Sequence, residues 1–499
     1  MTARYFQQAP ADTRLRVITG ALMLSLFLAA TETTFVTTAM PTIAAQLGGL
    51  AAYSWVFSGF MLSFTASIAV FGKLSDLLGR RRIYLAAMAI FLTASVLCGI
   101  ARSMNELILY RIVQGIGAGG LTPLIFAIIG DIYSLDQRAR VQGLFASVWG
   151  VSSILGPVVG GFLVDGLSWR WVFLLNAPIG ALATTVLMTV WTDDAPRAGA
   201  RIDYAGAALL VGTIVCLLLA LLAMDRLGGW HSGSTWGLIS LALLSCTALW
   251  RVERAAADPI VPVGLFGERL FLVACGQAFA SGFAVFGSLT FIPLFVQLGS
   301  GVGATQAGAS LIPLLLPWVV ASNVGSRLIL RFPFRSVALC GTTSIVIGLA
   351  GVTLAGIGSS RELFVLNTGL IGIGMGLSSP VFLIAVQTSM RKATLGTATS
   401  TLQLSRSIGT AIGVTLMGAI LSFHMGRRLE RGSAAAVTSL PAEVRAPLSA
   451  AQHELFGTAL VAALASLAFT AFAPRGRLTR RVEERVAGGW TEASTVPGT

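Results

Sequence analysis

An acidic side chain lies inside an apolar stretch near the start of the sequence. Glu32 occurs in the segment AATETTFVTTAMPTI, among threonines and within a mostly apolar run at about 17–40. Removing a carboxylate from water favours its neutral form, so a group in this position can bind and release a proton near neutral pH. We therefore expect Glu32 to exchange protons or to contact a small molecule. The alternative is a permanent ion pair with a fixed cation.

Arg111 is the cation best placed to meet this acid. It occurs in the segment YRIVQGIGAGG, early in another apolar run. If the two helices run in opposite directions at 1.5 Å per residue, Glu32 lies roughly 12 Å and Arg111 roughly 9 Å below the same outer surface. Gln114 is one turn further on the same face, and the glycines after it permit close helix approach. We expect Arg111 to bias the protonation of Glu32; the alternative is a packing arginine satisfied by backbone carbonyls.

A short charged loop follows the second apolar run. Its sequence, GKLSDLLGRRR, contains Asp76 four residues before Arg80, with Gly72 and Gly79 nearby. The glycines permit tight helix ends, and the aspartate can accept hydrogen bonds from an arginine or from the amides at a helix N-terminus. We interpret these four residues as a gate that must open when two halves of the protein move. A simple positive anchor would explain the arginines but neither the aspartate nor the glycines.

Small residues cluster in the fifth apolar run. The segment GVSSILGPVVGG contains Gly150, Gly156, Pro157, Gly160 and Gly161. Glycine and proline at this density kink a helix and let it pack closely against a partner. We expect this helix to seal one face of a cavity. Ordinary packing of small residues would account for the glycines but would give the Gly-Pro pair no special role.

Aromatic and polar side chains elsewhere are candidates for a broad-specificity pocket. Such pockets combine aromatic surface with a few polar anchors. Most aromatic residues at helical spacing merely face lipid or a neighbouring helix, whereas an arginine near the middle of a helix is expected to face the protein interior. The candidate substrate-binding residues are Phe35, Trp55, Gln114, Phe283, Phe286, Gln387, Gln403 and Arg406.

These residues require a scaffold of membrane-spanning helices. Of the 499 residues, 55% are hydrophobic and 11% are charged, and the mean hydropathy is +0.81. This composition excludes a water-soluble enzyme, and the unbroken apolar runs exclude a membrane β-barrel, in which apolar residues alternate with polar ones. Runs of about 20 apolar residues span a bilayer. We predict fourteen such helices near 17–40, 51–72, 83–101, 105–130, 141–164, 170–191, 205–225, 235–252, 269–297, 306–330, 336–358, 362–388, 397–421 and 456–474.

The positive charge of the chain predicts its orientation. The formal net charge is +13, and most arginines fall in loops on one side of an alternating count, so we predict that side and both termini to be cytoplasmic. The outer loop 423–454 is an exception, and we predict short amphipathic helices there. No basic run is interleaved with exposed aromatic residues, so nucleic acid is not an expected partner. Three scattered histidines and five cysteines within apolar runs predict no metal site.

A weak internal repeat predicts two halves. The loop GKLSDLLGRRR has a degenerate counterpart, GSRLILRFPFR, after the tenth predicted helix. Two six-helix bundles with two helices inserted between them fit the parallel repeats of transporters. We predict an N-terminal six-helix bundle at 1–195, two inserted central helices at 196–255, a C-terminal six-helix bundle at 256–475 that includes the outer loop 423–454, and a cytoplasmic tail at 476–499.

Together these segments resemble the major facilitator superfamily, and within it the 14-span drug:proton antiporters. The resemblance rests on TETTFVTTAMPTI, GKLSDLLGRRR, YRIVQGIGAGG, GVSSILGPVVGG and SWRWVFLLNAPIG, and more loosely on GIGMGLSSP and STLQLSRSIGTAIG. It implies the major facilitator fold and the export of amphipathic, often cationic compounds in exchange for protons, with no cofactor besides the proton gradient. Two positions depart from the family pattern. Glu32 stands where aspartate is usual, and Leu77 replaces a basic residue, which removes one donor from the gate.

We therefore expect a monomeric, proton-coupled multidrug efflux antiporter in the lipid bilayer of a bacterial inner membrane, with a role in antibiotic resistance. Glu32 is the only acid that we place deep in the membrane. Exchange of one proton for one monovalent cation moves no net charge, so monocationic or neutral amphipathic substrates are expected. The alternative is a dedicated exporter of a lipid, a siderophore or an antibiotic. An enzyme would need an acid pair, a metal triad or a nucleophile with its base, and a channel would need a selective ring of carbonyls or charges; we find neither pattern.

Overall fold

The computed structural model describes most of the chain, and the described part is overwhelmingly helical. The described residues are 11–47, 53–191, 203–226, 233–256, 263–300, 309–355, 360–391, 394–431 and 442–475. Within these ranges every regular element is a helix, and no strand occurs. The prediction of an all-α protein is therefore confirmed.

Seven helices form the N-terminal half. They are α2 (Ala11–Leu47), α3 (Tyr53–Leu78), α4 (Arg80–Ile100), α5 (Met104–Ile132), α6 (Leu135–Gly166), α7 (Arg170–Leu174) and α8 (Asn176–Val190). The span predicted at 170–191 is divided into α7 and α8 at Leu175. Local residues set the helix ends. Gly79 adopts a φ of 96°, which lets a single residue separate α3 from α4. The side chain of Ser103 accepts a hydrogen bond from the backbone N–H of Glu106 and caps α5.

Two helices follow this half, and the remaining elements form the C-terminal half. The two intervening helices are α9 (Tyr204–Arg226) and α10 (Gly233–Ala255). The C-terminal half comprises η3 (Val263–Gly267), α11 (Arg269–Ser281), η4 (Gly282–Phe286), α12 (Gly287–Ser300), α14 (Ile312–Arg331), α15 (Phe334–Ala355), α16 (Arg361–Ser389), α17 (Leu395–Arg431) and α18 (Ala442–Ala471). The span predicted at 269–297 is a continuous helical run in which a π-helical turn, η4, separates α11 from α12.

The structure differs from the prediction in the segment 423–454. α17 continues to Arg431 and α18 already begins at Ala442, so both spans extend into the predicted outer loop, and its described part contains no separate surface helix. α17 has 37 residues. At 1.5 Å per residue it is about 55 Å long, well beyond the roughly 30 Å apolar core of a bilayer. The prediction differs because it takes the charged residues of this segment as the ends of the two spans, whereas in the structure they lie within α17 and α18.

Thirteen helical stretches among the described residues are long and apolar enough to cross a membrane. The multi-pass architecture is therefore confirmed. α6 has 32 residues but is not one of the thirteen. Its first residues, LDQRARVQG, are polar, and serines follow further along. The fourteenth span thus stays a prediction.

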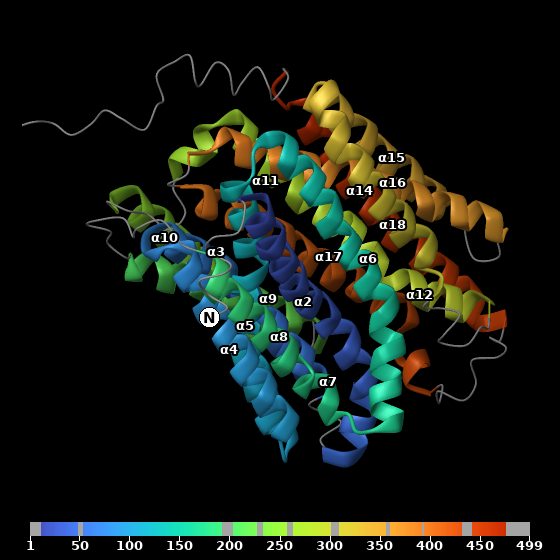
Figure 1. Cartoon of the computed structure of the whole chain (residues 1–499). Helices are drawn as coiled ribbons and strands as arrows, with labels where there is room; N and C mark the ends of the chain where they lie inside the picture. The colour runs from blue at the N-terminus through green and yellow to red at the C-terminus, as the bar shows by residue number, and fades with distance from the viewer. Residues whose placement is uncertain are drawn as a thin grey trace, which may run out of the picture.

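The helices pack in two bundles that meet chiefly along two helix pairs. In the first bundle α2 packs on α6 and α8, while α5 packs on α3 and α4; in the second, α16 packs on α14 and α15. The bundles meet where α6 contacts α14 and where α3 contacts α17. In Figure 1, α6 lies between the blue helices of the first bundle and the group of α14, α15 and α16. α9 contacts α3 and α17 and therefore lies against one of these junctions, and α10 pairs with α9.

Candidate functional site

An ion pair between Glu32 of α2 and Arg111 of α5 lies in the interior of the first bundle. Neither residue is exposed to solvent. Nη1 of Arg111 donates to Oε1 of Glu32 and, at 2.8 Å, to Oε1 of Gln114. Nε of Arg111 donates to the backbone oxygen of Val56 at 3.4 Å. The ring of Phe60 covers the guanidinium, with its centroid 4.0 Å from Cζ of Arg111. The two side chains that the sequence places at similar depth are therefore direct partners.

Two further polar residues complete this network. Nδ2 of Asn176, at the start of α8, donates to Oε2 of Glu32 and to Oγ of Ser95, each at 2.8 Å. Oγ of Ser95 also accepts from Nε2 of Gln114 at 3.0 Å and donates to the backbone oxygen of Phe173 at 3.0 Å. Sequence analysis missed both residues. The available signal was a polar side chain within each of two apolar runs, one of them the segment SWRWVFLLNAPIG.

The glycines of α5 bring three helices close enough to build this network. A Cβ at Gly115 would lie 2.4 Å from the backbone oxygen of Phe60 in α3, and one at Gly117 would lie 2.5 Å from the backbone nitrogen of Phe91 in α4. Any side chain at either position would force the helices apart. The small residues after Arg111 therefore fix the distance between α5 and its neighbours, and with it the position of the guanidinium under the Phe60 ring.

The charge of this pair is linked to its geometry. Loss of either charge from a buried pair leaves the other charge uncompensated in a medium of low dielectric constant. A proton on Glu32 would leave Arg111 with the neutral oxygens of Gln114 and Val56 as its hydrogen-bond acceptors. The binding of one proton to Glu32 would thus remove the ion pair that joins α2 to α5.

Asp76, at the end of α3, binds the N-terminus of α17. Its Oδ1 accepts from the N–H of Gly396 at 2.9 Å, and its Oδ2 accepts from the N–H and Oγ1 of Thr397 at 2.7 and 2.8 Å. Nη2 of Arg80 lies 3.5 Å from Oδ1 of Asp76, and Nε of Arg80 lies 3.4 Å from Oδ2 of Asp131. A carboxylate at a helix N-terminus is stabilised by the helix dipole. Asp76 therefore joins the two bundles, and Arg80 links it to Asp131 at the end of α5.

The other residues of this loop also fit the contact. A Cβ at Gly72 would lie 1.9 Å from Oγ of Ser400, so glycine permits the close approach of α3 and α17. Gly79 provides the left-handed turn that separates α3 from α4. Leu77, which stands where the family usually has a basic residue, is buried. It adds apolar packing here and donates no side-chain hydrogen bond.

We call the end of the protein where α3 ends and α4 begins the arginine-rich end. Two further contacts join the bundles, one toward this end and one nearer the middle of the helices. Nε2 of Gln387 in α16 donates to the backbone oxygen of Phe126 in α5 at 2.8 Å. Nδ2 of Asn323 in α14 donates to Oγ of Ser147 in α6 at 3.2 Å. Gln387, a candidate for the cavity wall, is thus a contact between the bundles in this conformation.

The glycine-rich segment of α6 has different neighbours along its length. A Cβ at Gly150 would lie 2.3 Å from a side-chain atom of α14 in the other bundle. One at Gly160 would lie 3.5 Å from atoms of α2, and one at Gly161 would have no neighbour within 4 Å. Close approach of the two bundles therefore occurs at the first glycine of the segment. The remaining members are Gly156, which is buried, and Pro157, whose side chain lies outside the described residues.

The aromatic candidates for substrate contact lie in both bundles. In the first bundle Phe35 is buried, whereas Trp55 is 38% exposed. In the second, Phe283 and Phe286 are partly buried on the π-helical turn, and the ring of Phe286 meets that of Trp318 edge-on with centroids 5.7 Å apart. In this conformation the structure does not bring these aromatic residues together. Within the described ranges, no three His, Cys, Asp or Glu side chains form a group that could hold a metal ion.

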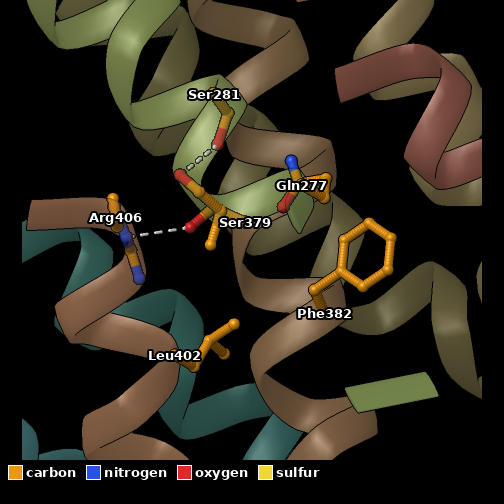
Figure 2. Close-up of a pocket in the computed structure, with 7 residues that line it drawn as sticks. Gln277, Ser281, Ser379, Phe382, Leu402 and Arg406 are labelled. Carbon is orange, nitrogen blue, oxygen red and sulfur yellow. Dashed lines mark hydrogen bonds between the residues drawn. The ribbon is translucent and has the colours of Figure 1, made fainter. Parts of the chain in front are cut away.

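Arg406 of α17 forms a second polar site, in the other bundle. Its Nη1 donates to Oγ of Ser379 at 3.1 Å, and its Nη2 donates to Oε1 of Gln403. Figure 2 shows the residues around a small cavity next to this arginine, and its volume is about 10 Å³. Sequence analysis singled out only Gln403 and Arg406 in this region. The labelled residues that line the cavity are Gln277 and Ser281 of α11, Ser379 and Phe382 of α16, and Leu402 and Arg406 of α17.

Comparison with known proteins gives consistent matches along the chain. The family model described as Major Facilitator Superfamily matches residues 22–414. The multidrug transporter protein MdtP of Bacillus subtilis is 35% identical over 437 residues, which cover 88% of this chain and 81% of that protein. Multidrug resistance protein 3 of Bacillus subtilis is 35% identical over 410 residues, covering 82% and 80%. The proton:xylose symporter XylE, a solved structure at 14% identity, aligns with a TM-score of 0.63 over 94% of this chain and 98% of that chain.

Proposed function

Because the chain belongs to the Major Facilitator Superfamily, we propose that it is a proton-coupled multidrug efflux antiporter that works by alternating access. It is a transporter and not an enzyme. The observation that carries the coupling proposal is the solvent-inaccessible pair of Glu32 and Arg111 inside the first bundle. Multidrug export is supported by two relatives whose names describe multidrug transport or resistance and which match over four fifths of their length.

The proposed setting is a bacterial inner membrane, with the arginine-rich end and both termini in the cytoplasm. The excess of arginine in the loops at that end supports this orientation. We propose α6 as the fourteenth span because it packs along α2 on one side and α14 on the other. The protein acts as a monomer without a cofactor, and the proton gradient supplies the energy.

In the proposed cycle this conformation is closed toward the cytoplasm. Three contacts support that assignment: Asp76 with the N-terminus of α17, Gln387 with α5, and Asn323 with α6. The first two join the bundles near the arginine-rich end, and the third joins them nearer the middle of α14 and α6. Opening toward the cytoplasm requires all of them to break, and Asp76 then loses its hydrogen bonds to the backbone and side chain of α17. These contacts therefore act as the gate of the inner side.

Coupling follows from what one proton does to the buried pair. A proton that binds Glu32 converts the carboxylate into a neutral acid and removes the charge that compensates Arg111. The amide of Asn176 can follow this change. Its Nδ2 now donates to Glu32, while its Oδ1 has no hydrogen-bond partner among the residues that the structure describes. A flip of the amide would present Oδ1 as an acceptor for the proton on Glu32. Protonation thus rearranges the contacts between α2, α5 and α8 and releases the bound substrate; deprotonation toward the cytoplasm restores the acceptor.

The number of acids limits the charge of the substrate. With one proton exchanged at Glu32, export of a monovalent cation moves no net charge across the membrane. For a neutral substrate, the membrane potential contributes about 2.3 kcal/mol per 100 mV to the exchange. We propose amphipathic substrates of net charge zero or plus one.

Dye uptake into everted membrane vesicles tests this function. An imposed pH gradient should drive uptake of chemically unrelated dyes by wild-type vesicles, because everted vesicles accumulate exported compounds. Glu32→Gln should abolish this uptake, while Glu362→Gln, a matched change at an exposed acid of α16, should leave it intact. Uptake at the wild-type rate in Glu32→Gln would exclude Glu32 as the coupling residue. Uptake of one compound class alone would instead support the dedicated exporter.

A further inference from the structure

Arg406 differs from the other arginine that lies deep in the membrane region, because no acid compensates it. It lies near the middle of the candidate membrane span Leu395–Leu421 in α17, and its hydrogen bonds go to the neutral oxygens of Ser379 and Gln403. Among the residues that the structure describes, it has no carboxylate within 4.0 Å. A guanidinium in a membrane interior is costly unless a negative group or water compensates it. Arg406 as a residue is only partly buried, and it borders a small cavity.

The cavity beside Arg406 is lined by further hydrogen-bond donors. Gln277 of α11 is 1% exposed, and its Nε2 has no hydrogen-bond partner among the described residues. A buried amide N–H without an acceptor costs free energy, so its presence at the edge of a cavity indicates a missing acceptor. Ser379 contributes a hydroxyl from a third helix, and Figure 2 shows it between Arg406 and Gln277. Donors from α11, α16 and α17 therefore face one small space that no acidic side chain lines.

Ser281 also lines this space, but its hydroxyl donates to the backbone oxygen of Ala278, and the other walls are apolar. Phe382 and Leu402 are both buried and line the same cavity. A space with cationic and amide donors on one side and an aromatic ring on another matches an amphipathic compound that carries an anionic group. At about 10 Å³ the cavity holds roughly one water molecule in this conformation. A larger group therefore requires the surrounding helices to move apart.

The structure provides a break in helix geometry next to this site. The π-helical turn η4 begins directly after Ser281, and a Cβ at Gly282 would lie 2.4 Å from the backbone oxygen of Arg406. π-Helical turns are rare and occur frequently at functional sites. Here the turn packs directly on the backbone that carries Arg406. A change in this turn would therefore move α11 relative to α17 and alter the size of the cavity.

We propose that Arg406, Gln277 and Ser379 bind an anionic group, such as a carboxylate or sulfonate, of the transported compound. The inference that the anion belongs to cargo rests on the proposed export function, whereas the anion site itself does not. Arg406 neutralises the charge, and the amide and hydroxyl donors complete its hydrogen bonds. An amphipathic zwitterion meets this requirement while keeping a net charge of zero. A free inorganic anion such as chloride has the same chemistry and is the other possible source.

Three dansyl probes that differ only in the charge of their tail test the proposal. Dansylglycine carries a carboxylate, dansylglycinamide is neutral, and dansylethylenediamine is cationic. Binding to the purified full-length protein in phosphatidylcholine nanodiscs is followed by dansyl fluorescence in gluconate buffer, with empty nanodiscs subtracted. We expect dansylglycine to bind about tenfold more tightly than the amide, the effect of one charge-assisted hydrogen bond pair.

Substitutions assign this preference to the site. Arg406→Gln should weaken binding of dansylglycine about tenfold and leave the neutral amide unchanged, which also shows that the variant is folded. Arg406→Lys should retain the preference in part, because it retains the charge. Gln277→Leu should weaken the anionic probe by a smaller factor. Arg254→Gln is the matched control, because Arg254 stacks on Trp250 of α10, away from the cavity.

Exchange of gluconate for chloride at constant ionic strength separates the two sources of the anion. If chloride displaces dansylglycine from the wild type but not from Arg406→Gln, the site accepts an inorganic anion. If chloride has no effect, the site selects an organic anion. Equal affinities for dansylglycine and its amide in the wild type, or a preference for the anion that persists in Arg406→Gln, would overturn the proposal. Dye efflux that fails while this preference is present would refute the proposed export function and leave the anion site standing.

Discussion

Two arginines that lie deep in the membrane region, one in each bundle, differ in their burial and in the charge of their partners. Arg111 in the first bundle has no solvent exposure, pairs with Glu32 and lies under the ring of Phe60. Arg406 in the second bundle is partly exposed, has only neutral partners among the described residues and borders a cavity. An arginine paired with a buried acid loses its counter-charge only when that acid is protonated. An arginine without a counter-charge is instead available to bind an anionic ligand.

From this difference we infer that the first bundle exchanges the proton and the second binds the ligand. In the proposed mechanism, the first bundle supplies the group that gains and loses a proton, Glu32, and Asn176, Ser95 and Gln114 surround its ion pair. The second bundle supplies hydrogen-bond donors around the cavity beside Arg406, and none of the residues that line this cavity is acidic. The two are mechanically connected at the arginine-rich end, where Asp76 binds the N-terminus of α17, the helix that carries Arg406.

The largest expected effect separates proton coupling from substrate choice. Glu32→Gln removes the titratable group, so dye efflux should no longer respond to an imposed pH gradient. Arg406→Gln should keep that response and change only which dyes are exported, because it leaves the first bundle intact. Both are measured in the same vesicles with and without the gradient. Loss of gradient dependence in Arg406→Gln would contradict the division between the bundles.

Replacement of the two arginines should have different effects on the stability of the folded protein. Arg111→Leu leaves the carboxylate of Glu32 buried without its counter-charge and should destabilise the protein by about 3–5 kcal/mol. Arg406→Leu removes an uncompensated charge and should be neutral or stabilising. Unfolding in detergent, followed by tryptophan fluorescence, gives both values. The double variant Glu32→Gln with Arg111→Leu should recover most of the loss, and equal destabilisation by both arginine variants would argue against the comparison.

The connection between the bundles should have an intermediate effect. Asp76→Asn replaces a charged acceptor of three hydrogen bonds from α17, each worth about 1.5–3 kcal/mol when an ionised group takes part. We expect the equilibrium to shift toward the conformation that is open at the arginine-rich end. Distances between spin labels on the two bundles at that end report the shift. Asp136→Asn, at an exposed position in the first turn of α6, should leave these distances unchanged.

The smallest expected effect concerns a neutral member of the network. Ser95→Ala removes the hydroxyl that accepts from Asn176 and Gln114, and should cost about 1 kcal/mol. Efflux should persist at a reduced rate, since the ion pair remains. Thr185→Ala, which removes an exposed hydroxyl bonded within its own helix, is the control and should be silent in both unfolding and efflux. A complete loss of efflux in Ser95→Ala would mean that the network, and not the pair, carries the coupling.

The sequence predicts the main features of the first bundle because depth along a helix can be counted. Glu32 and Arg111 lie in antiparallel helices, and the rise per residue places them at similar levels. The partners Asn176 and Ser95 could not be ranked in this way. Each is a single polar residue in an apolar run, and which face it occupies depends on helix rotation and on the turn at Leu175 that divides α7 from α8.

The second bundle was harder to predict for physical reasons. Arg406 stands out because a charge in an apolar run is rare. Gln277, however, becomes informative only when its amide is found without an acceptor beside a cavity, which is a tertiary property. The π-helical turn at η4 and the extension of α17 to Arg431 also depend on packing and on where water begins, and neither leaves a periodic signal in the sequence.

Proton release on substrate binding tests the central claim most directly. The purified protein, held in weakly buffered detergent with a pH indicator, is mixed with a dye that it exports, and the protons released per protein are counted. We predict release by the wild type in a pH range where Glu32 is partly protonated, none by Glu32→Gln, and unchanged release by Glu362→Gln. Equal release by the wild type and Glu32→Gln would contradict the account, because some other group would then exchange the proton.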